Sequence, residues 1–264
     1  MAVTSARNIV ENNLQEKGHF EHDNERIIEK YTLADKLPSQ LKELNLRPRN
    51  ISKPAYSLRK LSTSDKGPVI EFLRKFFFRD EPLNLTINLL ETPESRCFEL
   101  EDYAASTLQD GVSVAVVDDQ GNFVGMVING IARREEVDYS DKSDECPHPK
   151  FKKILKLLNY LDREAAIWEK LPPTCDTVLE IRIASTHSDW RGRGLMRVLC
   201  EESERIAKEI DAGALRMDTT SAFSAAAAER LHYKSVFRVL YSEIPYAPHP
   251  DPPHSEARVY LKQI

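Results

Sequence analysis

The spacing of hydrophobic positions divides the chain into a sparse N-terminal part and a patterned remainder. Residues 1–54 are rich in Glu, Asn and Lys, and their apolar side chains are too few to form a core. We therefore expect residues 1–54 to be a polar extension and residues 55–264 to form the folded domain.

Five segments within residues 55–264 have helical periodicity. Apolar positions 69, 70, 72, 73, 76 and 77 predict a first helix, which we expect to stop at the segment "RDEPLN", where Pro82 ends regular structure. Further helices are predicted over 93–108, 151–170 and 195–210, and over the Ala-rich segment 224–232.

Runs rich in β-branched residues predict the strands. The segment "VSVAVVDDQGNFVGMVINGIA" is typical of a hairpin whose turn contains Gly121. Further strands are predicted at 56–61, 178–185, 214–219, 235–244 and 257–264. Strands that alternate with helices indicate one α/β domain with a sheet of six or seven strands.

Composition excludes several classes of protein. A net charge of −5 argues against nucleic-acid binding, and no apolar run approaches the about 18 residues of a membrane span. The first residues lack the apolar centre of a secretory signal. Four widely spaced cysteines and scattered histidines indicate free thiols and no metal site. We expect a cytoplasmic monomer without nucleic-acid or membrane partners.

The segment "DWRGRG" lies between a predicted strand and a predicted helix. Unpaired N–H groups at a helix start attract anions, glycines let the backbone approach them closely, and arginines add donors suited to phosphate oxygens. The spacing fits neither a P-loop nor a dinucleotide-binding fingerprint. A pyrophosphate cradle is one interpretation, and a tight turn with solvent-facing arginines is the alternative.

This segment resembles the coenzyme-A-binding motif of the GNAT acyltransferases, (Gln/Arg)-x-x-Gly-x-(Gly/Ala). Asp189 stands at its first position, where the family has Gln or Arg. The segments "FFFRDEPLN" and "TTSAFSAAAAERLHY" are similar to the arthropod arylalkylamine N-acetyltransferase branch. The resemblance covers residues 56–264.

The resemblance implies a GNAT fold, a mixed sheet flanked by helices, in which strand 178–185 splays from segment 214–220. It implies acetyl-CoA as co-substrate, with loop N–H groups on the pyrophosphate and strand backbone on the pantetheine arm. The cofactor-binding residues it indicates are Ile183, Ala184, Arg191, Gly192, Arg193, Gly194 and Leu195.

For catalysis the resemblance implies Glu81 as the general base, with the hydroxyls of Thr220 and Ser224 near the thioester. From the residues alone, Glu81 could be a solvated loop carboxylate and Ser224 a helix cap. Ala228 stands where many family members carry a tyrosine as general acid, so the identity of that acid stays open.

Two other reactive side chains are expected to be structural. His187 follows a strand and is interpreted as a loop histidine, and Cys200 as a packed thiol. The Pro-rich segment 246–254 is either a border of the acceptor entrance or a rigid loop without a role in the reaction.

The function indicated by the resemblance is direct acetyl transfer from acetyl-CoA to a small, arylalkyl amine. The alternatives are polyamine or protein acceptors, longer acyl donors, and a non-catalytic acyl-CoA-binding protein. The negative net charge suits a cationic acceptor but does not choose among these.

Overall fold

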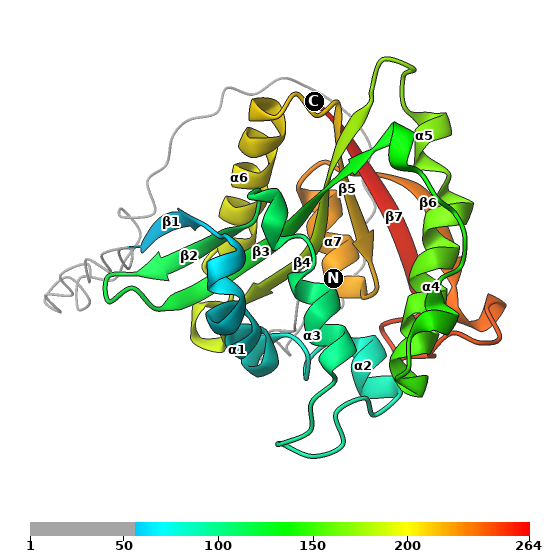
Figure 1. The fold of residues 1–264 in the computed structure, drawn as a ribbon, viewed down its shortest axis with the longest axis horizontal. Coiled ribbons are helices and arrows are strands. Elements are labelled where there is room, and N and C mark those ends of the chain that lie inside the picture. The colour runs from blue at the N-terminus through cyan, green and yellow to red at the C-terminus, as the bar shows by residue number, and fades with distance from the viewer. Residues whose placement is uncertain (1–55) are drawn as a thin grey trace, which may run out of the picture. The chain divides into compact units, whose positions relative to one another are not determined.

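Seven strands form one mixed sheet in the order β1-β2-β3-β4-β5-β7-β6, shown from left to right in Figure 1. The structure is a computed structural model that describes residues 56–264, so the predicted extension over 1–54 lies outside the described residues. The strands are β1 Tyr56–Lys60, β2 Val114–Asp118, β3 Phe123–Arg133, β4 Thr177–Thr186, β5 Ala214–Thr219, β6 Lys234–Leu240 and β7 Glu256–Gln263. This confirms the predicted fold class.

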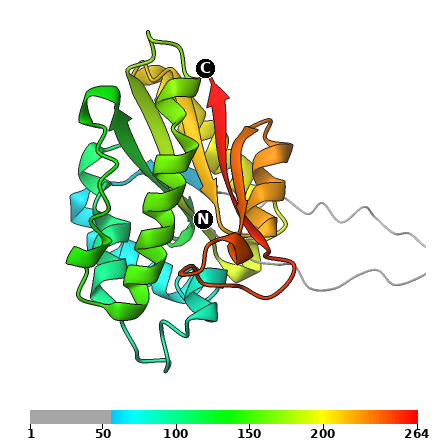
Figure 2. The ribbon, with the colours of Figure 1, turned by 90° about the vertical axis from the view of Figure 1, so that its right-hand side faces the viewer.

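Helices cover both faces of the sheet. They are α1 Lys66–Phe76, α2 Pro82–Thr86, α3 Phe98–Ala105, α4 Pro149–Ala165, α5 Ile167–Lys170, α6 Leu195–Glu209 and α7 Ala222–Arg230. The apolar residues of α1, α3 and α4 pack in one core, and those of α6 and α7 pack in a second core. In Figure 2, α4 and α7 accordingly lie on opposite sides of the sheet. Because both faces are covered, the central strands are mostly apolar, and the charged exceptions on β4 and β5 are Glu180, Arg182, Arg216 and Asp218.

The two central strands part before they end. β4 and β5 are the parallel pair of the sheet, and their pairing runs from Val178–Ala214 to Ile181–Met217. β4 continues to Thr186, where it still pairs with β3, while β5 continues to Thr219. A bulge in the β3–β4 ladder inserts Arg182 at this point, and bulges bend a strand locally. The predicted splay is therefore present.

Two predictions about the segment that follows α1 are corrected. Pro82 was expected to end regular structure, but it begins the short helix α2, with Glu81 as its N-cap. Proline suits the first position of a helix because the missing N–H has no partner there in any case. The helix expected over 93–108 is confined to α3, Phe98–Ala105.

Two further boundaries differ from the prediction. The helix expected over 151–170 breaks at Ala166, whose φ of 40° is left-handed, and continues as α5. The strand expected over 235–244 ends at Leu240, and a 3₁₀ turn, Tyr241–Glu243, follows it. In the helix a single left-handed residue, Ala166, interrupts the predicted element, whereas the strand gives way to the 3₁₀ turn.

Within residues 56–264, none of the helices combines the length and apolar character that a membrane crossing requires. The same residues contain no group of three or more His, Cys, Asp or Glu side chains arranged to hold a metal ion.

Candidate active site

A cavity of about 280 Å³ opens where β4 and β5 part, on the face covered by α1 to α4. Its strand walls come from the 180–183 stretch of β4 and from Arg216, Asp218 and Thr220. The remaining wall is mostly apolar: Phe77, Leu83, Leu100, Tyr103, Phe151, Ile154, Leu155 and Leu158. Glu81 also lines it, so the cavity joins a carboxylate, a hydroxyl and an apolar surface.

Glu81 and Thr220 are in direct contact, although 139 positions separate them in the sequence. The hydroxyl of Thr220 donates to one carboxylate oxygen of Glu81 at 2.9 Å. The other carboxylate oxygen accepts from the backbone N–H of Asn84 at 2.8 Å, as the cap of α2. The fold therefore brings two of the predicted catalytic residues together.

Glu81 is 5% exposed, so it is not the solvated loop carboxylate of the alternative interpretation. Burial raises the pKa of Glu81 above its ordinary value, because the charged form loses hydration. The hydrogen bonds from Asn84 and Thr220 oppose this rise by stabilising the carboxylate. A carboxyl with a raised pKa suits a general base that works near neutral pH.

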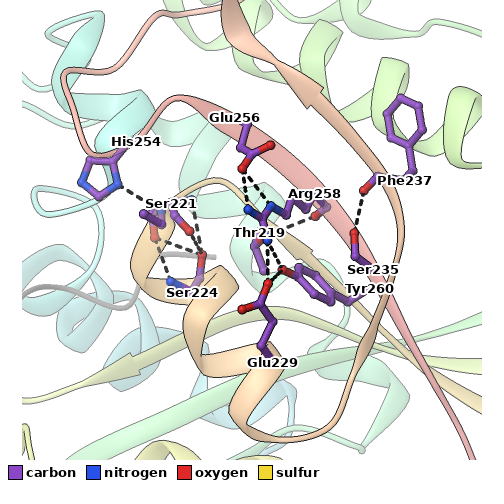
Figure 3. A network of polar contacts seen from close by, with 11 residues as sticks. Thr219, Ser221, Ser224, Glu229, Ser235, Phe237, His254, Glu256, Arg258 and Tyr260 are labelled. Atoms are coloured by element: carbon purple, nitrogen blue, oxygen red, sulfur yellow. Dashed lines mark hydrogen bonds and ion pairs between the residues drawn. The ribbon is translucent and has the colours of Figure 1, made fainter. Parts of the chain in front are cut away.

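Ser224 lies at the start of α7 and outside the cavity lining. Ser221 is the N-cap, and Ser224 is the third residue of the helix in a capping box with it, as Figure 3 shows. The hydroxyl of Ser224 lies 3.0 Å from the Ser221 hydroxyl and donates to the Ser221 carbonyl at 3.0 Å. The side chain is fully buried. The N-cap expected at Ser224 in the alternative interpretation is therefore Ser221, and Ser224 is its capping-box partner inside the first turn of α7.

The segment 187–194, here called the cofactor loop, connects β4 to α6. Gly192 and Gly194 have φ values of 75° and 82°, a region that favours glycine. Among the described residues, no heavy atom lies within 4 Å of a Cβ placed on either glycine. The first turn of α6, which begins at Leu195, carries no acidic residue. The open cradle and the helix start fit a pyrophosphate group.

The two arginines of the cofactor loop differ in their contacts. The guanidinium of Arg191 pairs with Asp80 at 2.8 Å and reaches the carbonyl of Thr186 at 3.4 Å. The guanidinium of Arg193 lies over the ring of Trp190, 5.1 Å from its centroid, and its side chain is exposed. Arg191 thus fastens the loop to the residue before Glu81, whereas Arg193 is the arginine that faces solvent.

Ile183 and Ala184, predicted to bind the pantetheine arm, lie on β4 beyond its pairing with β5. Each pairs with β3 on one side, opposite Ile128 and Val127 respectively. Their other backbone edge faces the gap between β4 and β5, because the β4–β5 ladder ends at Ile181. Because successive residues of a strand direct their N–H and C=O groups to opposite edges, one of these two residues offers both groups to the gap and its neighbour offers them to β3.

An ion cluster in the cavity was missed by the sequence analysis. Arg216 is 6% exposed and is contacted by three carboxylates. Asp218 binds it through two hydrogen bonds of 2.9 and 2.8 Å, Glu180 lies at 3.2 Å, and Asp162 completes the set. The sequence did contain a signal for this cluster: charged residues stand at alternate positions of two otherwise apolar strands. Since buried charges are normally paired, this pattern indicates an ion cluster between the two strands.

The remaining predicted side chains have structural roles. The ring nitrogen Nδ1 of His187 accepts from the backbone N–H of Asp189, and the ring lies 4.2 Å from that of Phe76. Cys200 is buried, and burial raises the pKa of its thiol to about 12. His187 therefore shapes the cofactor loop, and Cys200 is a packed thiol, as expected.

No protein-family model matches the sequence. The chain is similar to the crystal structure of arylalkylamine N-acetyltransferase 2 from Aedes aegypti, with 31% identity over 79% of this chain and 99% of that chain and a TM-score of 0.73. It is also similar to polyamine N-acetyltransferase from Drosophila melanogaster, an enzyme that forms N-acetylagmatine (18% identity, 80% of this chain, 100% of that chain, TM-score 0.69). A mosquito arylalkylamine N-acetyltransferase-like protein, 5b, matches with 20% identity, the same two coverages and the same TM-score. The first likeness extends to the sequence, while the other two concern the fold.

Proposed function

This chain belongs to the arthropod arylalkylamine N-acetyltransferase branch of the GNAT superfamily and is an acyl-CoA:amine N-acyltransferase; we propose that it transfers the acetyl group of acetyl-CoA directly to a small arylalkylamine. The observation that carries the proposal is the contact between Glu81 and Thr220 beside the gap between β4 and β5. It supports the proposal because a thioester in that gap and an amine in the cavity would meet beside a buried carboxylate and a hydroxyl.

Glu81 is the general base of the proposed reaction. The ammonium of the acceptor gives one proton to the Glu81 carboxylate, directly or through a water molecule. The nitrogen then forms the new C–N bond to the acetyl carbon, and the C–S bond of the thioester breaks. The departing sulfur takes the second proton of the nitrogen, so the products are the amide, free coenzyme A and one released proton.

The other site residues hold the two substrates in place. The backbone of Ile183 and Ala184 would bind the pantetheine arm, and the cofactor loop with the N–H of Leu195 would bind the pyrophosphate. The hydroxyl of Thr220 would hold Glu81 and face the thioester. Ser224 would not contact the substrates, and its hydrogen bond to Ser221 would hold the start of α7, which follows Thr220.

The lining of the cavity favours an aromatic acceptor. Phe77, Tyr103 and Phe151 contribute rings to one wall, and burying an aryl group against them removes apolar area from water. The carboxylates around Arg216 favour a second class, amines with an additional cationic group. These two features of one cavity define the acceptors to compare.

The test is a thiol-release assay with purified protein, acetyl-CoA and tyramine, dopamine, serotonin, agmatine or spermidine. We expect release that depends on an added amine, with kcat/KM higher for the three aromatic amines. A preference for agmatine or spermidine would transfer the proposal to the polyamine class. Absence of release with every amine, together with calorimetric binding of acetyl-CoA, would contradict it and favour longer acyl donors or protein acceptors.

We assign this activity to residues 55–264 and place the protein in the cytosol as a monomer. All four cysteines are free and buried, which fits a reducing compartment. Size-exclusion chromatography with light scattering tests the monomer.

A further inference from the structure

Tyr241 lies behind Thr220 and does not line the cavity. It is the first residue of the 3₁₀ turn after β6, and its side chain is 2% exposed. Its phenol donates to the backbone carbonyl of Thr220 at 2.7 Å. Its backbone N–H donates to the carbonyl of Ser255 at 3.1 Å, so the tyrosine is held at both ends.

Thr220 lies where the regular pairing of β5 has ended. The β4–β5 ladder ends at Met217, and the β5–β7 ladder ends at Thr219. The next residue, Ser221, is already the cap of α7. The carbonyl of Thr220 is thus fixed by the phenol of Tyr241 instead of by a rung of the sheet.

We propose that Tyr241 is a positioning residue for the transfer reaction, which fixes the backbone of Thr220 so that its hydroxyl stays on the carboxylate of Glu81. This inference rests on the proposed function, because it concerns the base assigned there. Tyr241 acts through Thr220 and touches neither substrate.

The expected effect follows from the charges around Glu81. The Thr220 hydroxyl stabilises the carboxylate, so its loss leaves the desolvation of Glu81 less opposed and raises the pKa of Glu81 further. Burial and the charge of Glu81 hold the pKa of Tyr241 well above its usual value, so the phenol remains a donor. Tyr241 also faces Glu256, and the other charged groups of the cavity, unchanged by the substitution, are Asp162, Glu180, Arg182, Arg216 and Asp218.

The primary experiment titrates Glu81 directly, so that it does not depend on activity. Protein labelled with ¹³C at the glutamate side-chain carboxyls is followed by NMR against pH, and the Glu81→Gln variant assigns the signal. In Tyr241→Phe we expect the Glu81 signal to titrate at a pH about one unit higher, the worth of one hydrogen bond to a carboxylate. With an active amine, the acidic limb of kcat/KM should move in the same direction.

Tyr260→Phe is the matched control. Tyr260 is also fully buried, and its phenol donates at 3.0 Å to Glu229, near the C-terminal end of α7, as Figure 3 shows. Tyr241→Phe removes one hydrogen bond of a buried tyrosine, and Tyr260→Phe removes two, because the Tyr260 hydroxyl also accepts from Arg258 at 3.0 Å. We therefore expect the melting temperature to fall at least as far in the control. Only Tyr241→Phe should change the titration of Glu81, which separates positioning from general stability.

Thr220→Val tests the route of the effect, since it removes the hydroxyl and keeps the shape. It should move the Glu81 titration as Tyr241→Phe does, and the double variant should move it no further. An unmoved Glu81 signal in folded Tyr241→Phe, or additive shifts in the double variant, would overturn the proposal. If Tyr241→Phe does not fold, Tyr241→para-aminophenylalanine keeps a weaker donor and should give a smaller shift, and no shift would likewise overturn it.

The outcomes separate this proposal from the proposed function. A shifted Glu81 titration in a protein that acetylates no amine would retain the positioning role and reject the reaction. Amine acetylation by the parent protein, with an unchanged Glu81 titration in Tyr241→Phe, would retain the reaction and reject the positioning role.

Discussion

The cofactor loop and the Glu81–Thr220 pair are built in opposite ways. The loop is one short, exposed segment whose shape depends on two glycines with left-handed φ. The pair is buried, its members are 139 positions apart, and its shape depends on side-chain hydrogen bonds. A site made of backbone tolerates side-chain changes, such as Asp189 at the first motif position, but not the loss of a glycine. A site made of buried side chains depends on each polar atom.

The largest expected effect is on the pair. Glu81→Gln keeps an oxygen that can cap α2 but removes the proposed base, so turnover should fall on the order of a hundredfold or more. Affinity for acetyl-CoA should stay within about twofold, since the cofactor loop is unchanged. Single-turnover kinetics and calorimetry measure the two quantities.

The control for this variant is Glu91→Gln, which removes a surface carboxylate paired with Lys150 and should leave both quantities unchanged. Unaltered turnover in Glu81→Gln would show that the base lies elsewhere.

The second effect is on the loop. Gly192→Val forces a branched side chain into φ of 75° and fills the open cradle, so affinity for acetyl-CoA should fall about tenfold or more. Gly121→Val is the matched control, because Gly121 has φ of 84° and equally open surroundings in the β2–β3 turn. Both variants should lose similar stability in thermal melts, and equal acetyl-CoA affinity in the two would argue against the cradle.

A smaller effect is expected at the ion pair between Arg191 of the cofactor loop and Asp80, the residue before Glu81. Asp80→Asn removes the partner of Arg191, and the pair is partly exposed, with side-chain exposures of 34% and 21%. Such a pair contributes at most about 1 kcal/mol, so the KM for acetyl-CoA should rise only about two- to fivefold as the loop loosens. A lower KM would show instead that Asp80 withholds Arg191 from the phosphates.

The smallest effect concerns stability. Glu81 has a raised pKa in the folded state, so its contribution to stability is present below the ordinary value of 4.5 and is lost as pH rises through the folded-state pKa. Glu81→Gln should therefore melt a few degrees higher than the parent at pH 7.5, and the difference should shrink toward pH 5. Thermal melts at the two pH values measure it, and a lower melting temperature at pH 7.5 would contradict the sign.

The sequence by itself determined the elements whose information is local. The strand over 214–219 has the predicted limits residue for residue, and the helix predicted over 195–210 ends within one residue of α6. The cofactor loop was also predictable, because strand, glycines and helix are contiguous and each fixes backbone geometry by local sterics.

Only the tertiary structure decided the burial and partners of the candidate site. Glu81 looks like a loop residue until α2 and Thr220 enclose it, and Ser224, four residues after Thr220, packs under the helix cap instead of facing the cavity. The cluster on Arg216 draws its carboxylates from α4, β4 and β5. A residue's burial, pKa and hydrogen-bond partners depend on segments distant in the chain, and periodicity describes one segment at a time.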